Sequence, residues 1–168
     1  MGEVGCLKDG NFQNLQVGGT TELNNTSMTG FVDGTATATL LASQSGQTIA
    51  VGAAAAGLVA HSTFTLPTVS KGLYYRFAYF GGATDAQNLL IQASPNTVGI
   101  LGGVGWHDHN TDSTAEPALV YSAVTTNDLF TITAPAAGTA FELVCDGASW
   151  FMNGFVVAGT TPAFSDGS

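Results

Sequence analysis

The side chains with the most obvious chemistry lie in residues 106–110, Trp-His-Asp-His-Asn. In an extended segment His107 and His109 share one face, so both imidazoles could reach one metal ion. A structural zinc requires four protein ligands and a catalytic zinc three, and His61 has no spacing relation to the pair. We therefore expect no metal site, unless a trimer axis repeats the pair. We expect Trp106, His107 and His109 to form a contact with another subunit.

Other catalytic patterns are incomplete. Asp108, Asp112 and Glu116 recur every four residues, but the glycine and bracketing carboxylates of a calcium loop are missing. Residues 102–105, Gly-Gly-Val-Gly, do not open a helix after a strand, as a phosphate-binding loop would. Glu142 is the best single acidic candidate for glycosidase chemistry, but its alternating segment predicts that it faces solvent. The sequence predicts no enzyme and no cofactor.

Composition excludes one class of partner. The chain has 168 residues, of which 9% are charged, and its formal net charge is -9. Lys8, Lys71 and Arg76 are its basic residues, whereas binding to a phosphate backbone requires clustered Lys and Arg. We expect no nucleic-acid partner. The 22 glycines and few charges indicate a β-structure with many turns rather than a helical protein.

Membrane insertion and secretion are not expected either. The apolar run at residues 50–60 is far shorter than the roughly 20 residues that a membrane helix needs, and no secretory signal is visible at the start. We expect assembly in a cytoplasm. Cys6 and Cys145 show no metal or redox spacing, so the sequence favours buried free thiols over a disulfide.

A β-hairpin at residues 139–157 is the clearest structural element. Apolar residues 141–145 and 150–152 flank a turn at 146–149, where Asp-Gly supplies a positive φ angle. Gly154 predicts either a bulge or a close backbone approach.

Eight further short segments have strand character. The segment 72–80 carries apolar residues at both phases, which predicts a strand covered on both faces, and Pro67 predicts a strand end or edge. Residues 102–117 predict a long polar connection. The expected fold is all-β, a β-sandwich or jelly roll of about ten short strands over residues 31–157. The eight segments are residues 35–41, 47–51, 62–66, 72–80, 88–93, 98–101, 118–124 and 129–133.

Both ends of the chain are expected to extend from this domain. Residues 1–30 form an N-terminal arm whose apolar residues Leu7, Phe12, Leu15 and Val17 are too few to enclose one another. We expect them to pack on a neighbouring subunit or partner, although a disordered leader is the alternative. Residues 158–168, rich in Gly, Thr, Pro and Ser, predict an extended and exposed tail.

Three segments carry a resemblance to a known class of proteins. They are Val-Gly-Cys-Leu-Lys-Asp-Gly-Asn-Phe-Gln-Asn-Leu-Gln-Val at 4–17, Phe-Thr-Leu-Pro at 64–67 before Gly-Leu-Tyr-Tyr-Arg-Phe at 72–77, and Glu-Leu-Val-Cys-Asp-Gly at 142–147 with Trp-Phe-Met-Asn-Gly at 150–154. Together they resemble the capsid decoration, or cement, proteins of tailed bacteriophages, especially those of marine and cyanobacterial hosts.

The resemblance implies a virion structural protein with no catalytic residue. Proteins of this kind are commonly trimeric β-sandwiches that sit on the outer shell and clamp neighbouring subunits of the major capsid protein. It therefore implies a homotrimer on the capsid exterior. Residues 14–21, Asn-Leu-Gln-Val-Gly-Gly-Thr-Thr, also resemble repeats of phage fibre shafts. A tail-fibre or appendage domain that attaches to a host receptor is the alternative.

Overall fold

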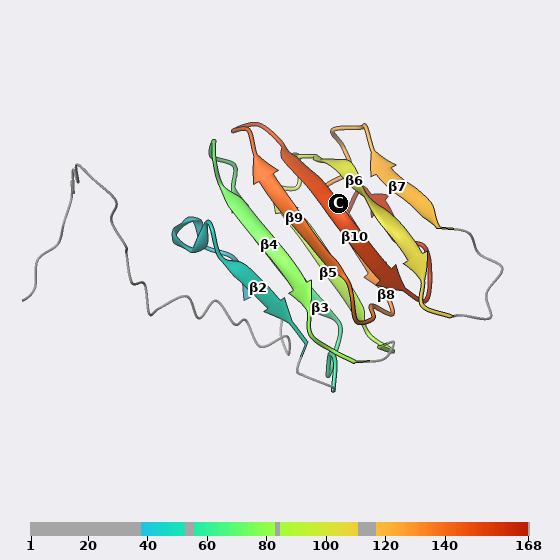
Figure 1. Ribbon diagram of the computed structural model, residues 1–168. Helices are drawn as coiled ribbons and strands as arrows, with labels where there is room; N and C mark the ends of the chain where they lie inside the picture. The colour runs from blue at the N-terminus through green and yellow to red at the C-terminus, as the bar shows by residue number, and fades with distance from the viewer. Residues whose placement is uncertain (1–37, 53–55, 83–84, 111–116, 168) are drawn as a thin grey trace, which may run out of the picture.

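The regular structure of the protein is almost entirely β. A computed structural model describes residues 38–52, 56–82, 85–110 and 117–167 (Figure 1). Within these ranges it contains eleven strands and one short 3-10 turn, Ala42–Gln44. The predicted all-β class is confirmed. The predicted arm, residues 1–30, lies outside the described ranges.

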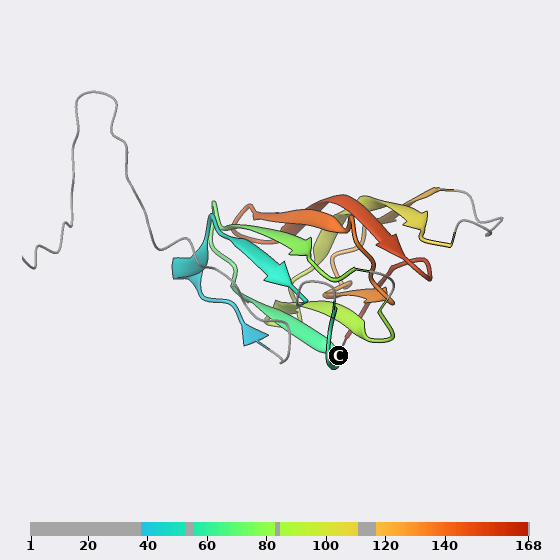
Figure 2. The same cartoon turned by 60° about the horizontal axis from the view of Figure 1, so that its bottom comes forward.

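The strands form two stacked sheets, seen edge-on in Figure 2. The five-stranded sheet has the order β1 (Ala38–Thr39), β3 (Ser62–Thr68), β5 (Asn88–Ser94), β8 (Leu129–Thr133) and β11 (Ala163–Ser165). The six-stranded sheet has the order β2 (Thr48–Val51), β4 (Tyr74–Tyr79), β9 (Ala140–Cys145), β10 (Trp150–Ala158), β6 (Ile100–Asp108) and β7 (Ala118–Ser122).

Both sheets are mixed because of the path of the chain. From β1 to β6 the chain changes sheet at every connection, so strands that become neighbours within a sheet run in the same direction. β1 and β3, β3 and β5, and β2 and β4 are accordingly parallel pairs. β6 then crosses to the far side of the six-stranded sheet and pairs in parallel with β10. Two parallel neighbouring strands must be joined by a long crossover connection, and here each such connection includes a strand of the other sheet.

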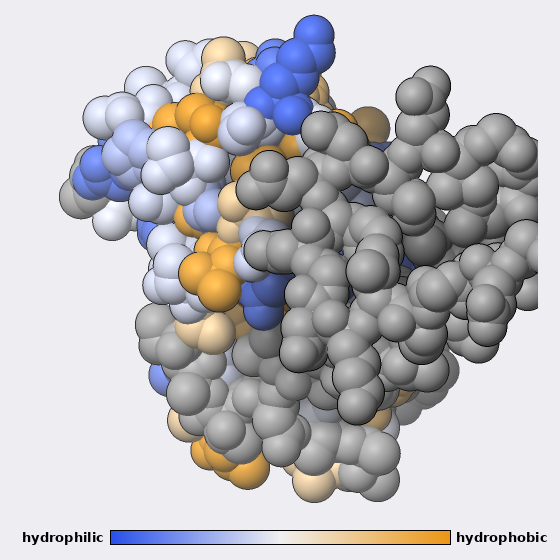
Figure 3. All heavy atoms as spheres, turned by 90° about the vertical axis from the view of Figure 1, so that its left-hand side faces the viewer, coloured by the Kyte–Doolittle hydropathy of each residue, from blue (hydrophilic) through white to orange (hydrophobic). Residues whose placement is uncertain are grey.

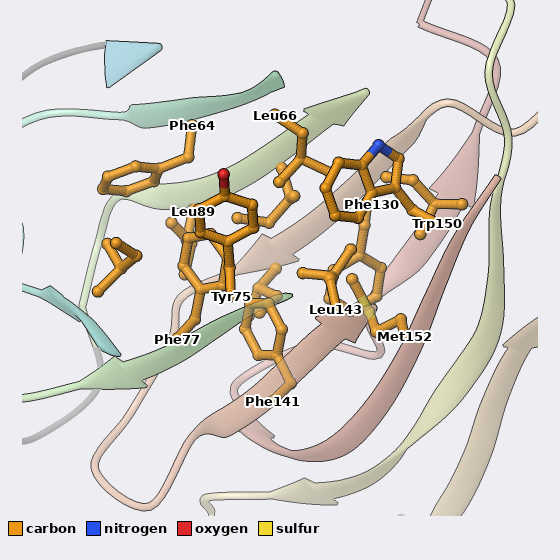
Figure 4. Packing of buried hydrophobic residues seen from close by; sticks show 14 of the residues in the cluster. Phe64, Leu66, Tyr75, Phe77, Leu89, Phe130, Phe141, Leu143, Trp150 and Met152 are labelled. Carbon is orange, nitrogen blue, oxygen red and sulfur yellow. The ribbon is translucent and has the colours of Figure 1, made fainter. Parts of the chain in front are cut away.

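The core fills the space between the sheets with alternate residues of each strand. Phe64 of β3 meets Phe77 of β4 edge-on at 5.6 Å between ring centroids, and Phe130 of β8 meets Phe141 of β9 in the same way at 5.8 Å (Figure 4). Each such fully buried side chain stabilises the fold by about 1.5–3 kcal/mol relative to exposure. Within the described residues, Nε1 of the fully buried Trp150 is the single buried side-chain nitrogen or oxygen without a hydrogen-bond partner.

The predicted hairpin is confirmed as β9 and β10. Its turn is fixed by Asp146, whose Oδ1 accepts hydrogen bonds from the backbone N–H groups of Ala148 and Ser149, both at 2.8 Å. These bonds hold the pKa of the Asp146 carboxyl below its usual range. Gly147 takes the positive φ, at 103°. Cys145 is a buried free thiol, as expected.

Gly154 marks a close backbone approach rather than a bulge. The pairing of β10 with β9 continues through it without a change of register. Its φ is 154°, and a Cβ atom there would lie 2.4 Å from Cα of Phe141.

The predicted polar connection at 102–117 is wrong in its first part, because β6 continues to Asp108. Val104 and Trp106 point into the core, and the positions that alternate with them are Gly103, Gly105 and His107. A half-buried strand is recognised in the sequence by apolar residues that alternate with polar ones. Here glycines take the place of polar residues, so the segment is not recognised as a strand.

The tail at 158–168 is not simply extended and exposed. Its residues 163–165 form β11, which pairs with β8. Phe164 packs on Phe130 at 4.6 Å between centroids, and the N–H of Gly167 donates to the buried Asp128 at 2.6 Å. One aromatic residue in a three-residue strand is too short a pattern to read from sequence.

Two strand-level expectations also change. β4 is covered on one face only: Tyr75 and Phe77 are buried, whereas Arg76 and Phe80 are exposed. Pro67 lies inside β3 and not at its end, at the point where pairing with β5 shifts register. The irregularity accommodates a residue that has no N–H to donate.

Candidate functional site

The predicted contact residues around β6 separate onto different faces. Trp106 is only 6% exposed, and its Nε1 donates to the carbonyl oxygen of Ala158 at 3.3 Å. The indole belongs to the core of this chain, so the expected contact role of Trp106 is wrong. His107 lies on the outer face of the strand and is exposed, and His109 is exposed just after the strand ends.

The histidines do not assemble a metal centre within the described residues. Nδ1 of His109 lies 3.5 Å from Oδ1 of Asp108, which also accepts from the N–H of Asn110 at 2.9 Å. Nδ1 of His61 instead accepts from the N–H of Asn88 beside the five-stranded sheet, at 2.8 Å. No group of three or more His, Cys, Asp or Glu side chains in the described part of the chain could hold a metal ion.

The remaining predicted contact residues, Leu7, Phe12, Leu15 and Val17, lie outside the described ranges. Within those ranges, no helix combines the length and the apolar character that crossing a membrane requires.

The outer face of the six-stranded sheet carries most of the large apolar side chains that the described chain leaves exposed. Seen from the β2 side, hydrophobic residues form separate patches between polar ones (Figure 3). On the outer face they follow neighbouring strands instead, and strand register places them in cross-strand pairs such as Val144 with Phe151. The exposed apolar residues of this face are Phe80, Val144, Phe151, Phe155, Leu119 and Tyr121.

The most exposed of these side chains lie on β7. Leu119 is 71% exposed and Tyr121 is 69% exposed. Among the described strands, β7 pairs only with β6 and therefore forms one edge of the six-stranded sheet. The residues opposite Leu119 and Tyr121 on β6 are Gly105 and Gly103. Leu119 and Tyr121, hereafter the β7 edge, therefore have no large side chain beside them on the paired strand. Exposed apolar edge strands promote association with another chain.

A polar row crosses the middle of the same face. Arg76 on β4 is paired with Glu142 on β9, and Glu142 is paired with Asn153 on β10. Paired residues on adjacent strands point to the same side of a sheet, so the three side chains stand in line. They border a depression, hereafter the hollow, which is lined by Arg76, Ala140, Phe141, Glu142, Asn153 and Gly154.

The carboxylate of this row accepts a hydrogen bond from a tyrosine on the strand that carries Arg76. The hydroxyl of Tyr74 donates to Oε2 of Glu142 at 2.8 Å, and this bond raises the pKa of the Tyr74 phenol. Among the described residues, the ion pair between His109 and Asp108 is the only one within 4.0 Å, so Arg76 has no carboxylate at that distance there. Arg76 is exposed and lines the hollow, and its guanidinium carries five N–H donors.

Sequence reasoning missed this row, although part of the signal was present. Arg76 alternates with Tyr75 and Phe77, which indicates an outward side chain in a strand whose other face is buried. The alignment of Arg76 with Glu142 and Asn153 depends on the order and register of strands that are far apart in the sequence, which no local pattern contains. The exposure of Leu119 and Tyr121 depends on the same strand order and register.

No protein-family model, curated protein or solved structure matches this chain.

Proposed function

We propose that the protein is a non-enzymatic virion structural protein, a capsid decoration or cement protein. In this role it binds the outer shell as a homotrimer and stabilises contacts between major capsid subunits. The class is suggested by the resemblance of residues 4–17, 64–77 and 142–154 to such proteins of tailed phages.

The observation that carries the proposal is the β7 edge. Leu119 and Tyr121 are 71% and 69% exposed on a strand that, within the described part of the chain, has a partner strand on one side only. In a protein that stays alone, such a strand usually carries charges or proline that prevent pairing. The five residues of β7, Ala-Leu-Val-Tyr-Ser, contain neither. A surface of this kind fits a protein that is covered by another chain in its working state.

The contact should depend little on charge. Lys71 and Arg76 are the basic residues of the described chain, and the whole chain carries a net charge of -9. These basic residues are too few for extensive ion pairing with an acidic shell, so neutral polar and apolar contacts repeated over a symmetric trimer would supply the affinity.

Co-sedimentation with expanded phage capsids tests the function directly. The purified full chain is expected to pellet with capsids at saturable, symmetric stoichiometry and to remain in solution without them. If it does not pellet with capsids but does adhere to host cells, the protein belongs to a fibre or appendage instead. Light scattering that finds only monomer at micromolar concentration would contradict the trimer.

A further inference from the structure

The hollow on the outer face combines groups that a contact with the capsid does not require. Its polar members are a guanidinium, a carboxylate and a carboxamide in a single cross-strand row. Arg76 is one of three basic residues in a chain of 168, and within the described residues it has no ion-pair partner. Such an Arg beside a depression indicates a binding role.

Charge balance at the hollow restricts the ligand. The positive charge of Arg76 stands beside the negative charge of Glu142, so a fully anionic ligand would gain from one group and be repelled by the other. A purely apolar ligand would leave both charges and the amide of Asn153 desolvated without partners, which is costly. A neutral ligand that carries many hydroxyl groups satisfies all three side chains.

The chemistry of the row matches neighbouring hydroxyls on a sugar ring. Arg76 donates only, Glu142 accepts only, and Asn153 does both, whereas each hydroxyl can donate and accept. Neighbouring strands lie about 4.8 Å apart, and the three residues stand on three neighbouring strands. Their polar side chains are therefore spaced at about this interval across the sheet. The carboxylate is already held by Tyr74, which fixes one acceptor before a ligand arrives.

Gly154 is part of the lining of the hollow, and the paired strand β9 approaches it closely, since a Cβ atom there would lie 2.4 Å from Cα of Phe141. Ala140 supplies an apolar part of the lining, and Phe155, its cross-strand partner, stands exposed next to it. An apolar surface beside a polar row fits the C–H face of a pyranose ring.

We propose that the hollow binds a neutral saccharide, with Arg76 and Asn153 donating to hydroxyl oxygens and Glu142 accepting from hydroxyl groups. The site is distinct from the β7 edge: β6, with the outward residues Gly103 and Gly105, separates the two. The proposal stands whether the protein decorates a capsid or belongs to an appendage.

Binding of the full chain to immobilised neutral oligosaccharides of glucose, galactose and mannose tests the proposal, with sialylated oligosaccharides as the acidic comparison. At least one neutral probe is expected to bind with a Kd of roughly 1 mM or tighter. Arg76→Gln and Glu142→Gln should each weaken that binding at least about tenfold, because each removes a hydrogen bond with a charged group. Lys71→Gln makes the same charge change as Arg76→Gln outside the hollow and should alter binding less than about twofold.

Three results would overturn the proposal. The first is that no neutral probe binds even at a probe concentration several times the expected Kd. The second is that only the sialylated probes bind. The third is equal loss of binding in Arg76→Gln and Lys71→Gln, which would indicate a general charge effect. If no saccharide binds and Arg76→Gln abolishes co-sedimentation with capsids, the hollow is a protein contact. If saccharide binding holds but capsids are not bound, only the proposed function fails.

Discussion

Phe77 and Phe141 stack face to face across the paired strands β4 and β9, with ring centroids 5.1 Å apart and ring planes 11° apart. Phe64 and Phe130 of the opposite sheet each meet one of these rings edge-on. The four rings join the two sheets at the centre of the core, where stacked and edge-on contacts add to simple burial (Figure 4).

Removal of a ring from this cluster should destabilise the protein strongly. Phe141→Ala is expected to lower the free energy of unfolding by about 3–5 kcal/mol, since it deletes buried area and leaves a cavity. Phe151→Ala is the matched control, because Phe151 lies on the adjacent strand with its ring on the exposed face. Its cost should stay within about 1 kcal/mol. Urea unfolding measures both, and similar costs would contradict this description of the core.

Gly154 should not tolerate even a methyl group. Gly154→Ala places a Cβ atom 2.4 Å from Cα of Phe141, and the backbone of the paired strand cannot move without breaking the ladder. A loss of about 1–3 kcal/mol in the free energy of unfolding is expected. Gly105→Ala is the comparison: the nearest atoms to its Cβ would belong to the ring of Phe155, at 3.3 Å, and the ring can shift, while the nearest backbone atom lies at 4.0 Å. Thermal unfolding should rank Gly105→Ala as the milder change.

Charges on the β7 edge should block association without unfolding the domain. The double substitution Leu119→Lys and Tyr121→Lys adds two charges at positions that are already exposed, so stability should change by less than about 1 kcal/mol. Self-association and capsid binding should fall sharply, because apolar contact is replaced by desolvated charge. Val59→Lys, at an exposed position outside the six-stranded sheet, controls for added charge. Sedimentation velocity that finds no difference between the two variants would exclude the β7 edge as a contact.

Deletion of residues 1–25 tests the predicted arm. The β-domain should stay folded with little change in melting temperature, while trimer formation or capsid binding weakens. The reason is that ordering the arm costs roughly 1–2 kcal/mol per backbone residue, which outweighs the burial of Leu7, Phe12, Leu15 and Val17 at about 1.5–3 kcal/mol each, so we expect the arm to order only where contacts with a partner add to that burial. A truncated protein that decorates capsids with unchanged affinity would show that the arm is only a leader.

Stability should fall above pH 10 because folding raises the pKa of Tyr75 and Tyr79, in addition to that of the hydrogen-bonded Tyr74. Burial raises the pKa of the Tyr75 phenol, and burial together with a hydrogen bond to Asp85 raises that of Tyr79 still further. In the unfolded chain both ionise near the ordinary value of 10.0. Below that pH both tyrosines are protonated in the folded and in the unfolded state, so their ionisation does not change the free energy of unfolding. Above it the unfolded state releases protons first, so the free energy of unfolding declines as pH rises.

An ultraviolet titration of tyrosinate, compared with urea unfolding at successive pH values, checks this expectation. Tyr79→Phe should remove part of the decline above pH 10, because the phenylalanine has no proton to release. The hydroxyl of Tyr79 donates to Oδ2 of Asp85 at 2.9 Å, so the variant also loses that bond at every pH. A decline of equal slope in the variant and the parent protein would assign the effect to other groups.

Local patterns in the sequence were sufficient for the fold class and for most strands. The hairpin around Asp146 and Gly147 was predicted because turn chemistry and flanking alternation act within a few residues. The same holds for the free thiol of Cys145 and for the demand that Gly154 places on its surroundings. Segment 72–80, which carries apolar residues at both phases, was instead predicted to be covered on both faces, and the structure covers only the face with Tyr75 and Phe77.

Only the tertiary structure decided which strands lie side by side. The chain alternates between sheets up to β6, so the partners of each strand come from distant segments, and register aligns Arg76, Glu142 and Asn153 into one row. The same long-range pairing buries Trp106 and exposes Leu119 and Tyr121, although all three are large and apolar. Composition and periodicity describe one strand at a time. A surface site is formed by side chains on neighbouring strands, and which strands are neighbours is decided by the packing of the whole chain.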